Sequence, residues 1–179
     1  MRTFVFKLYV MSDDPAEYIT KNSLNEAITT YITRVEQENP LRIAHKNISY
    51  ENLLRDKMLL VDAIHEGIPI GLFNLIRQEM PYTDDDWADF LDISKRSLDR
   101  FKAHGDHVFK SIHSEKIFEL AEVTQLGNSV FDTPDDFYTW LNTKSLALGN
   151  KMPITLLGNS YGKDMVINEL HAIDQGIFV

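Results

Sequence analysis

The stretch from Asp84 to His104 constrains the fold of this chain most, because its pattern requires two short helices that cross steeply over a tight turn. Such a crossing needs a small residue within the first helix, and Ala88 supplies it. The turn needs a residue that tolerates a left-handed backbone, as Asp92 can, and Ser94 can cap the second helix. The apolar residues at core-facing offsets are Trp87, Leu91, Ile93, Leu98 and Phe101. The spacing therefore predicts a helix-turn-helix.

Basic side chains gather on the second helix of this unit. Between Ile93 and His104, four lysines and arginines stand against one acid, Asp99, although the whole chain has a formal net charge of -9. Local charge placement sets the field at a site, and the second helix of such a unit enters the major groove of DNA. We therefore expect DNA binding, with Lys102 on a phosphate and the others at the groove. The expected DNA-binding residues are Ser94, Lys95, Arg96, Ser97, Arg100 and Lys102.

Two other interpretations of this stretch stay open. An ordinary helical hairpin with a solvated charged face would show the same periodicity. The acids from Asp84 to Asp86, together with Asp99, would repel phosphate if they faced a duplex. That arrangement would leave a degenerate unit that is kept only for dimerisation. Thr83 before the three acids gives them a structural explanation, because an N-cap followed by acids suits the start of a helix.

Helical spacing of apolar residues continues on both sides of the unit and predicts an all-α fold. Before the unit it covers Leu24 to Val35 and then Leu53 to Met80, and after it Ser111 to Phe131 and Tyr161 to Gln175. The residues from Arg2 to Val10 alternate loosely, which allows a short strand or an ordered arm.

These patterns divide the chain of 179 residues into three parts. We expect a variable N-terminal helical extension over residues 1–58, a helix-turn-helix domain over 59–131 and a small helical domain over 132–179. The last part is near the lower size limit for an independent core, yet it carries Trp140, two leucine pairs and a terminal Ile-Phe-Val. Such a segment either packs on the preceding helix or buries its surplus apolar surface in a partner.

Composition argues against several other classes of function. The chain has no cysteine, which excludes disulfides, thiol nucleophiles and cysteine-ligated zinc. No apolar run approaches the ~20 residues of a membrane span, and no signal cleavage site follows the N-terminus, so we expect a cytoplasmic protein with no membrane partner. The six histidines do not show metal-ligand spacing, and there is no phosphate-binding glycine motif. We expect neither an enzyme, nor a metal, nor a cofactor.

An ordered set of residues, taken together with the helix-turn-helix, resembles the Xre/MbcA/ParS family of antitoxins. The set comprises Trp140-Leu141, Leu146-Ala-Leu-Gly149, Pro153, Leu156-Leu157, Gly162 and Ile173-Asp-Gln-Gly176-Ile177-Phe178. The stretch Glu66-Gly-Ile-Pro69 is similar to the start of the family's helix-turn-helix domain. The resemblance covers Leu59 to Val179, and its one departure is Asp92 where the turn usually has glycine.

The resemblance implies a function and its partners. Family members are encoded beside a toxin with a RES domain, which acts on NAD, and their C-terminal region packs against that toxin and obstructs its NAD site. Their helical N-terminal domain dimerises and represses the shared operon. We therefore expect a type II antitoxin whose partners are a RES-domain toxin, operator DNA and a second copy of itself. The residues that would build the toxin-binding domain are Trp140, Leu141, Leu148, Pro153, Leu156, Leu157, Ile173, Gly176, Ile177 and Phe178.

Alternatives remain for the whole chain and for its end. The chain could be a stand-alone helix-turn-helix transcriptional regulator with a C-terminal protein-interaction domain, or an interaction module whose helix-turn-helix is inactive. The apolar residues after Gly176 could plug a cleft in the toxin, or Phe178 could return to the chain's own core.

Overall fold

The computed structural model describes residues 15–37 and 47–176, and within these ranges the regular structure is entirely helical. Two isolated bridges, Pro69 with Val108 and Ser145 with Lys151, are the extended pairings found there. This confirms the all-α prediction, while the strand or arm expected over Arg2 to Val10 lies outside the described residues. The helices are α1 (Pro15–Gln37), α2 (Tyr50–Arg55), α3 (Lys57–Glu66), α4 (Ile70–Ile76), α5 (Asp84–Phe90), α6 (Lys95–His104), α7 (Ser111–Val130), α8 (Pro134–Leu141) and α9 (Ser160–Asp174), with 3-10 turns at η1 (Arg77–Glu79) and η2 (Pro153–Leu156).

Short polar side chains fix where these helices begin. Thr83 accepts the backbone N–H of Asp86 and forms a capping box that starts α5. Ser94 caps α6, and Thr133 caps α8 ahead of a proline in its first turn. The periodicity from Leu53 onward looked continuous, but Asp56 divides it, because its side chain accepts two backbone N–H groups at the start of α3. A capping side chain therefore overrides an apolar pattern that spans both helices.

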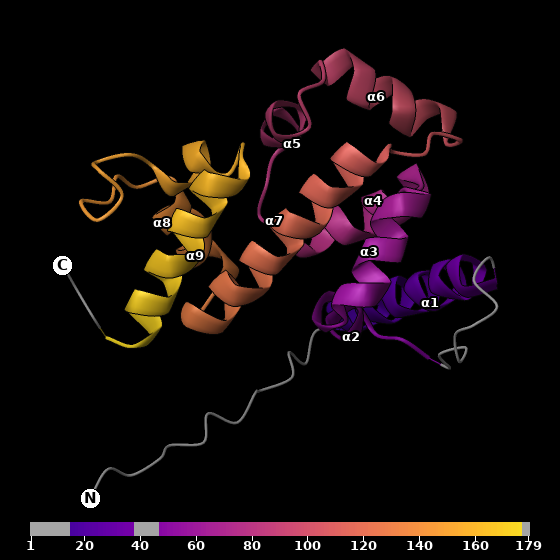
Figure 1. Ribbon diagram of the computed structural model, residues 1–179, viewed down its shortest axis with the longest axis horizontal. Coiled ribbons are helices and arrows are strands. Elements are labelled where there is room, and N and C mark those ends of the chain that lie inside the picture. Colours follow the sequence, from indigo (N-terminus) through magenta and orange to yellow (C-terminus); the bar gives the residue numbers. More distant parts are fainter. Residues whose placement is uncertain (1–14, 38–46, 177–179) are drawn as a thin grey trace, which may run out of the picture.

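Helix α7 crosses the middle of the molecule and is shared by its two halves (Figure 1). Helix α3 packs against it from the side of α1 to α4, and α9 packs against it from the other side. Helices α5 and α6 pack on one another and lie above the N-terminal half of α7 in this view. One continuous apolar core runs from Leu24 in α1 to Leu170 in α9.

Helix α1 belongs to this core rather than lying on its surface. Leu24, Ile28 and Ile32 are fully buried. The hydroxyl of Tyr31 donates to the carbonyl oxygens of Ala63 at 2.8 Å and Gly67 at 2.9 Å, and so joins α1 to the end of α3. In the described ranges, no helix combines the length and the apolar character needed to cross a membrane.

Candidate nucleic-acid interface and protein-docking surface

Helices α5 and α6 are joined by the tight turn that the sequence predicts. Asp92 has a φ of 50°, which is the left-handed conformation expected at the turn. The backbone N–H of Ile93 donates to the carbonyl oxygen of Ala88 at 3.0 Å and closes the turn on α5. Ala88 is buried where the helices meet, which explains why this position requires a small residue.

Aromatic packing holds this unit on the core. Trp87 is fully buried and meets the rings of Phe73 and Tyr82 edge to face, with ring centroids 4.9 and 5.7 Å apart. On α6, Leu98 is fully buried and Phe101 packs against the core from a half-buried position. Leu98 and Phe101 therefore anchor α6 on the core, and most of its other side chains are exposed.

The six expected DNA-binding residues all lie on α6 or at its cap. Ser94 accepts the backbone N–H of Ser97, and their two hydroxyl oxygens lie 2.8 Å apart. Arg96 and Arg100 are exposed. The guanidinium carbon of Arg100 lies 5.6 Å from the ring centroid of Phe101, within the range of a cation–π contact.

The acids that precede α6 are paired with its cations. Lys102 Nζ lies 2.7 Å from Asp84 Oδ2, and Arg77 also contacts that carboxylate. The hydrogen bond from Lys102, assisted by Arg77, holds the pKa of Asp84 below its ordinary value. Lys95 Nζ lies 2.7 Å from Asp85 Oδ1. Two of the expected DNA-binding cations thus have carboxylate partners within the chain.

Two histidines pack behind α6. The ring of His107 stacks on Phe101 with centroids 3.5 Å apart and an interplanar angle of 3°. Burial lowers the pKa of His107 and that of His113. Both rings therefore favour the neutral form. Within the described residues, no three histidine or carboxylate side chains come together in a way that could hold a metal ion.

The C-terminal helices pack around a group of three aromatic rings. Phe131, Phe137 and Trp140 lie with their centroids 5.6 to 6.1 Å apart. Gly127 of α7 allows Phe137 to approach, since a Cβ atom at this glycine would lie 2.3 Å from the phenylalanine ring. Helix α8 can therefore lie close against the end of α7.

A half-buried ion cluster joins α9 to α7. Glu119 lies 2.6 Å from Lys116 Nζ and 3.2 Å from Lys163 Nζ, measured to its two carboxylate oxygens. Lys116 also donates to the carbonyl oxygen of Leu157 at 3.2 Å. These contacts fix α9 and the turn before it against the central helix.

The residues expected to form the toxin-binding domain divide by burial. Leu141, Leu148, Pro153 and Leu157 are buried, so their side chains build the core of this part. Trp140, Leu156 and Ile173 are half-buried. Gly176 is exposed. Ile177 and Phe178 lie outside the described residues, so the alternatives of a plug and a core residue stay open.

Sequence reasoning missed the apolar side chains that this part exposes. Tyr161 is 85% exposed and Met165 is 46% exposed, one turn apart on the outer face of α9. Leu146, in the loop before η2, is 80% exposed. The signal was present, because Val166 and Leu170 define the buried stripe of α9 and leave Tyr161 and Met165 off it.

Comparisons with known proteins match both halves of the described structure. The family model for the antitoxin Xre-like helix-turn-helix domain matches residues 59–122, and the model for the antitoxin Xre/MbcA/ParS C-terminal toxin-binding domain matches residues 126–176. Among solved structures, a chain in the crystal structure of the M. tuberculosis MbcT-MbcA toxin-antitoxin complex is similar at 21% identity and a TM-score of 0.48. That match covers 62% of this chain and 96% of the other. No curated protein matches the chain.

Proposed function

The chain belongs to the Xre/MbcA/ParS antitoxin family, and from this premise we propose that it neutralises a RES-domain toxin and represses its own operon. The observation that carries the proposal is the presence of both matched domains in one chain, joined through α7. On the resemblance, the toxin acts on NAD and the antitoxin covers its NAD site. We propose that the protein is a homodimeric regulator without catalysis or a cofactor of its own.

Operator binding would use the outer face of α6. Arg96 and Arg100 are exposed there and would reach the major groove, together with Ser94 and Ser97 at the N-terminal end of the helix. Lys95 and Lys102 would exchange a carboxylate partner for a phosphate, or share it. Because cations on phosphates release counterions, binding is expected to weaken steeply with salt.

A mobility shift with the native promoter tests this role. Arg96→Ala and Arg100→Ala are expected to weaken operator binding strongly, because each removes an exposed cation from the groove-facing helix. Unchanged binding by both variants would mean that α6 does not contact DNA. The chain would then act through its toxin-binding domain alone.

Toxin neutralisation would use the surface of residues 126–176. Its buried leucines hold the domain together, while Trp140, Leu156 and Ile173 reach the surface in part. Tyr161 and Met165 add an exposed apolar strip on α9. Removal of residues 176–179 is expected to weaken neutralisation and to spare operator binding. Loss of both together would mean that the chain end is part of the core.

Co-purification with the product of the neighbouring gene is the decisive experiment. We expect a RES-domain protein that depletes NAD when it is expressed alone and is inhibited by this chain. If no neighbouring gene encodes such a protein and the chain binds only its promoter, the chain is a stand-alone regulator instead.

A further inference from the structure

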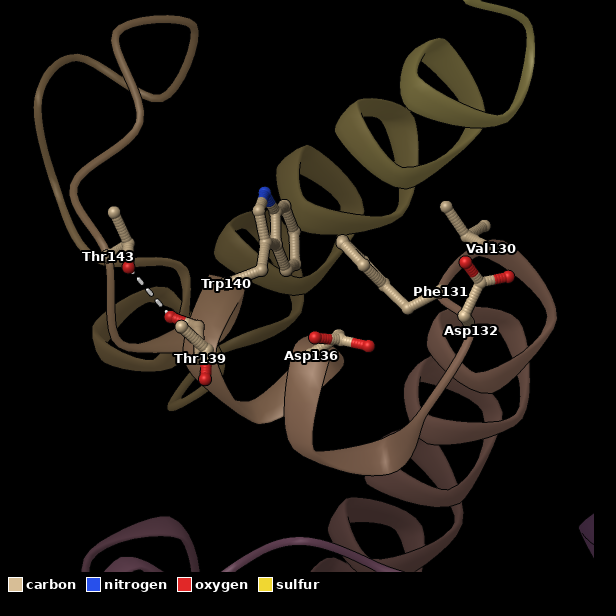
Figure 2. Close-up of a pocket in the computed structure, with 7 residues that line it drawn as sticks. All are labelled: Val130, Phe131, Asp132, Asp136, Thr139, Trp140 and Thr143. Carbon is tan, nitrogen blue, oxygen red and sulfur yellow. Dashed lines mark hydrogen bonds between the residues drawn. The ribbon is translucent and has the colours of Figure 1, made fainter.

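A hollow of about 530 Å³ lies beside the junction of α7 and α8, inside the matched toxin-binding domain. The half-buried rings of Phe131 and Trp140 form its apolar wall. Exposed Asp132, Asp136 and Thr139 stand around it, and Val130 and Thr143 complete the lining. Figure 2 shows the two carboxylates and the two rings around the same space. The hollow is therefore an open surface feature with an aromatic wall and an acidic rim.

The chemistry of the lining selects a cation. The residues around the hollow include two acids and no lysine or arginine. Aromatic faces attract cations, and a guanidinium can stack on a ring while it donates to carboxylates. One oxygen of Asp136 accepts from Thr133 Oγ1 at 2.6 Å, which fixes the carboxylate in place at the start of α8. A flat, delocalised cation can stack on the aromatic rings and hydrogen-bond to the carboxylates at the same time.

We propose that this hollow receives an arginine side chain of the partner toxin. The inference rests on the proposed function and adds the chemistry of one contact to it. The hollow lies wholly within the matched toxin-binding region, which carries six acids against three lysines over residues 126–176. An acidic domain of this kind favours a basic face on its partner. Because the hollow is open, it suits a side chain that projects from a partner's surface.

The test measures the affinity of the full-length chain for the purified cognate toxin at two salt concentrations. The double variant Asp132→Asn and Asp136→Asn is expected to bind about tenfold more weakly and to lose part of the salt dependence, since two charge-assisted contacts are weakened. Thr139→Arg is expected to weaken binding at least as much, because it brings a cation of this chain to the hollow.

Matched controls separate the hollow from general effects of charge. Asp135→Asn with Asp164→Asn removes the same charge from exposed acids of the same domain that do not line the hollow. Asp135 also lies in the first turn of α8, so this control includes the helix-dipole contribution. The control is expected to bind the toxin within about twofold of the unchanged protein. The melting temperature should fall by a similar small amount in the hollow variant and in the control, since each removes one first-turn acid of α8, and operator binding should be unchanged in all variants.

The outcomes distinguish this inference from the proposed function. If the unchanged chain binds the toxin and the hollow variants bind equally well, the arginine site is wrong and the antitoxin function stands. If the unchanged chain does not bind the toxin, both are overturned. If the hollow variants instead change the self-association of the chain, the occupant is a second copy and not the toxin. Rescue of Thr139→Arg by an arginine-to-glutamate change in the toxin would confirm the pairing.

Discussion

Lys95 at the start of α6 has a carboxylate partner that DNA would have to replace. Its ammonium lies 2.7 Å from Asp85, and that hydrogen bond raises the pKa of Lys95. Asp85→Asn should therefore leave the full positive charge of Lys95 without its carboxylate partner at the end of α6 that we propose enters the groove. We expect tighter operator binding and a salt slope that is steeper by about one. Fluorescence anisotropy with labelled operator over a series of salt concentrations measures both.

Asp89→Asn is the matched control, because Asp89 is an exposed acid of the same helix. It makes the same change in net charge without removing the partner of Lys95. Equal gains from the two variants would show that only the total charge of α5 matters. The ion pair with Asp85 would then have no specific effect on operator binding.

His107 and His113 make the base of α6 sensitive to acid. Burial lowers the pKa of both rings below 6.5. The nearby His113 and Arg100 lower the pKa of His107 further. Lys110 has the same effect on the pKa of His113. Asp106 acts in the opposite direction on the pKa of His107, and Asp92 does so on that of His113. The unfolded chain therefore binds more protons as the pH falls through 6.5, so the free energy of unfolding decreases from about pH 7 downward.

His107→Gln should flatten that dependence, because it removes one of the two groups. Urea unfolding between about pH 7 and pH 5.5 measures the slope. His65→Gln is the control, since His65 is exposed on α3. A slope that stays the same in His107→Gln would contradict the assignment of the pH dependence to this ring.

Short-range features of single residues were predictable from the sequence. The caps at Thr83 and Ser94 and the left-handed Asp92 depend on chemistry within a few residues, and all three are confirmed. The pairing of Lys95 with Asp85 was not predicted, because it depends on how two helices cross. An acid run that looked repulsive to DNA is instead engaged by cations of its own chain.

At the scale of elements, Gly127 permits the contact between α7 and α8. A Cβ atom there would lie within 2.5 Å of three atoms of the Phe137 ring, which is buried and cannot move away freely. We expect Gly127→Ala to lower the free energy of unfolding by about 1–3 kcal/mol, as overpacked cores do. Toxin binding should weaken with it, because α8 carries Trp140.

Gly71→Ala tests the same substitution in an open helical position. Nothing lies within 4 Å of a Cβ atom built at Gly71, so alanine should stabilise α4 by about 0.5–1 kcal/mol. Thermal unfolding compares the two variants directly. Destabilisation of equal size at both glycines would contradict the assignment to the phenylalanine contact, because helix propensity favours alanine at both positions.

The periodicity of apolar residues predicted most of the helices but not which side chains they expose. The helices expected over Ser111 to Phe131 and Tyr161 to Gln175 are present within a residue or so at each end. Two of the leucines expected to build the toxin-binding domain, Leu141 and Leu157, are fully buried. Family patterns emphasise residues that build a domain, whereas contact surfaces depend on which side chains the packing leaves outside, as with Tyr161.

At the scale of the whole molecule, α1 shares one apolar core with the helix-turn-helix domain. We expected a variable extension over residues 1–58, because the family resemblance begins only at Leu59. In the structure, α1 buries Ile28 and Ile32 in the common core. The hydroxyl of Tyr31 donates to the carbonyl oxygens of Ala63 and Gly67, which are 32 and 36 residues away in the sequence. Such long-range contacts are beyond the reach of local patterns.

Tyr31→Phe tests whether α1 supports the domain. The change keeps the ring but removes the hydroxyl that donates to the carbonyl oxygens of Ala63 and Gly67. The carbonyl oxygen of Ala63 still accepts the backbone N–H of Gly67, so the main loss is at the buried carbonyl of Gly67. The free energy of unfolding should fall by about 1–3 kcal/mol. Burial raises the pKa of Tyr31, so the hydroxyl stays protonated and donates throughout the working range.

The matched control for this change is Tyr161→Phe, which removes a hydroxyl from a side chain that is 85% exposed. Urea unfolding should show no change in this control, and hydrogen exchange should show faster opening at Gly67 and Ile68 in Tyr31→Phe alone. The two residues precede the bridge from Pro69 to Val108 that joins the start of α4 to the segment after α6. Equal stability of the two variants would mean that α1 covers the domain without holding it together, and α6 would then keep its position without help from the N-terminal helix.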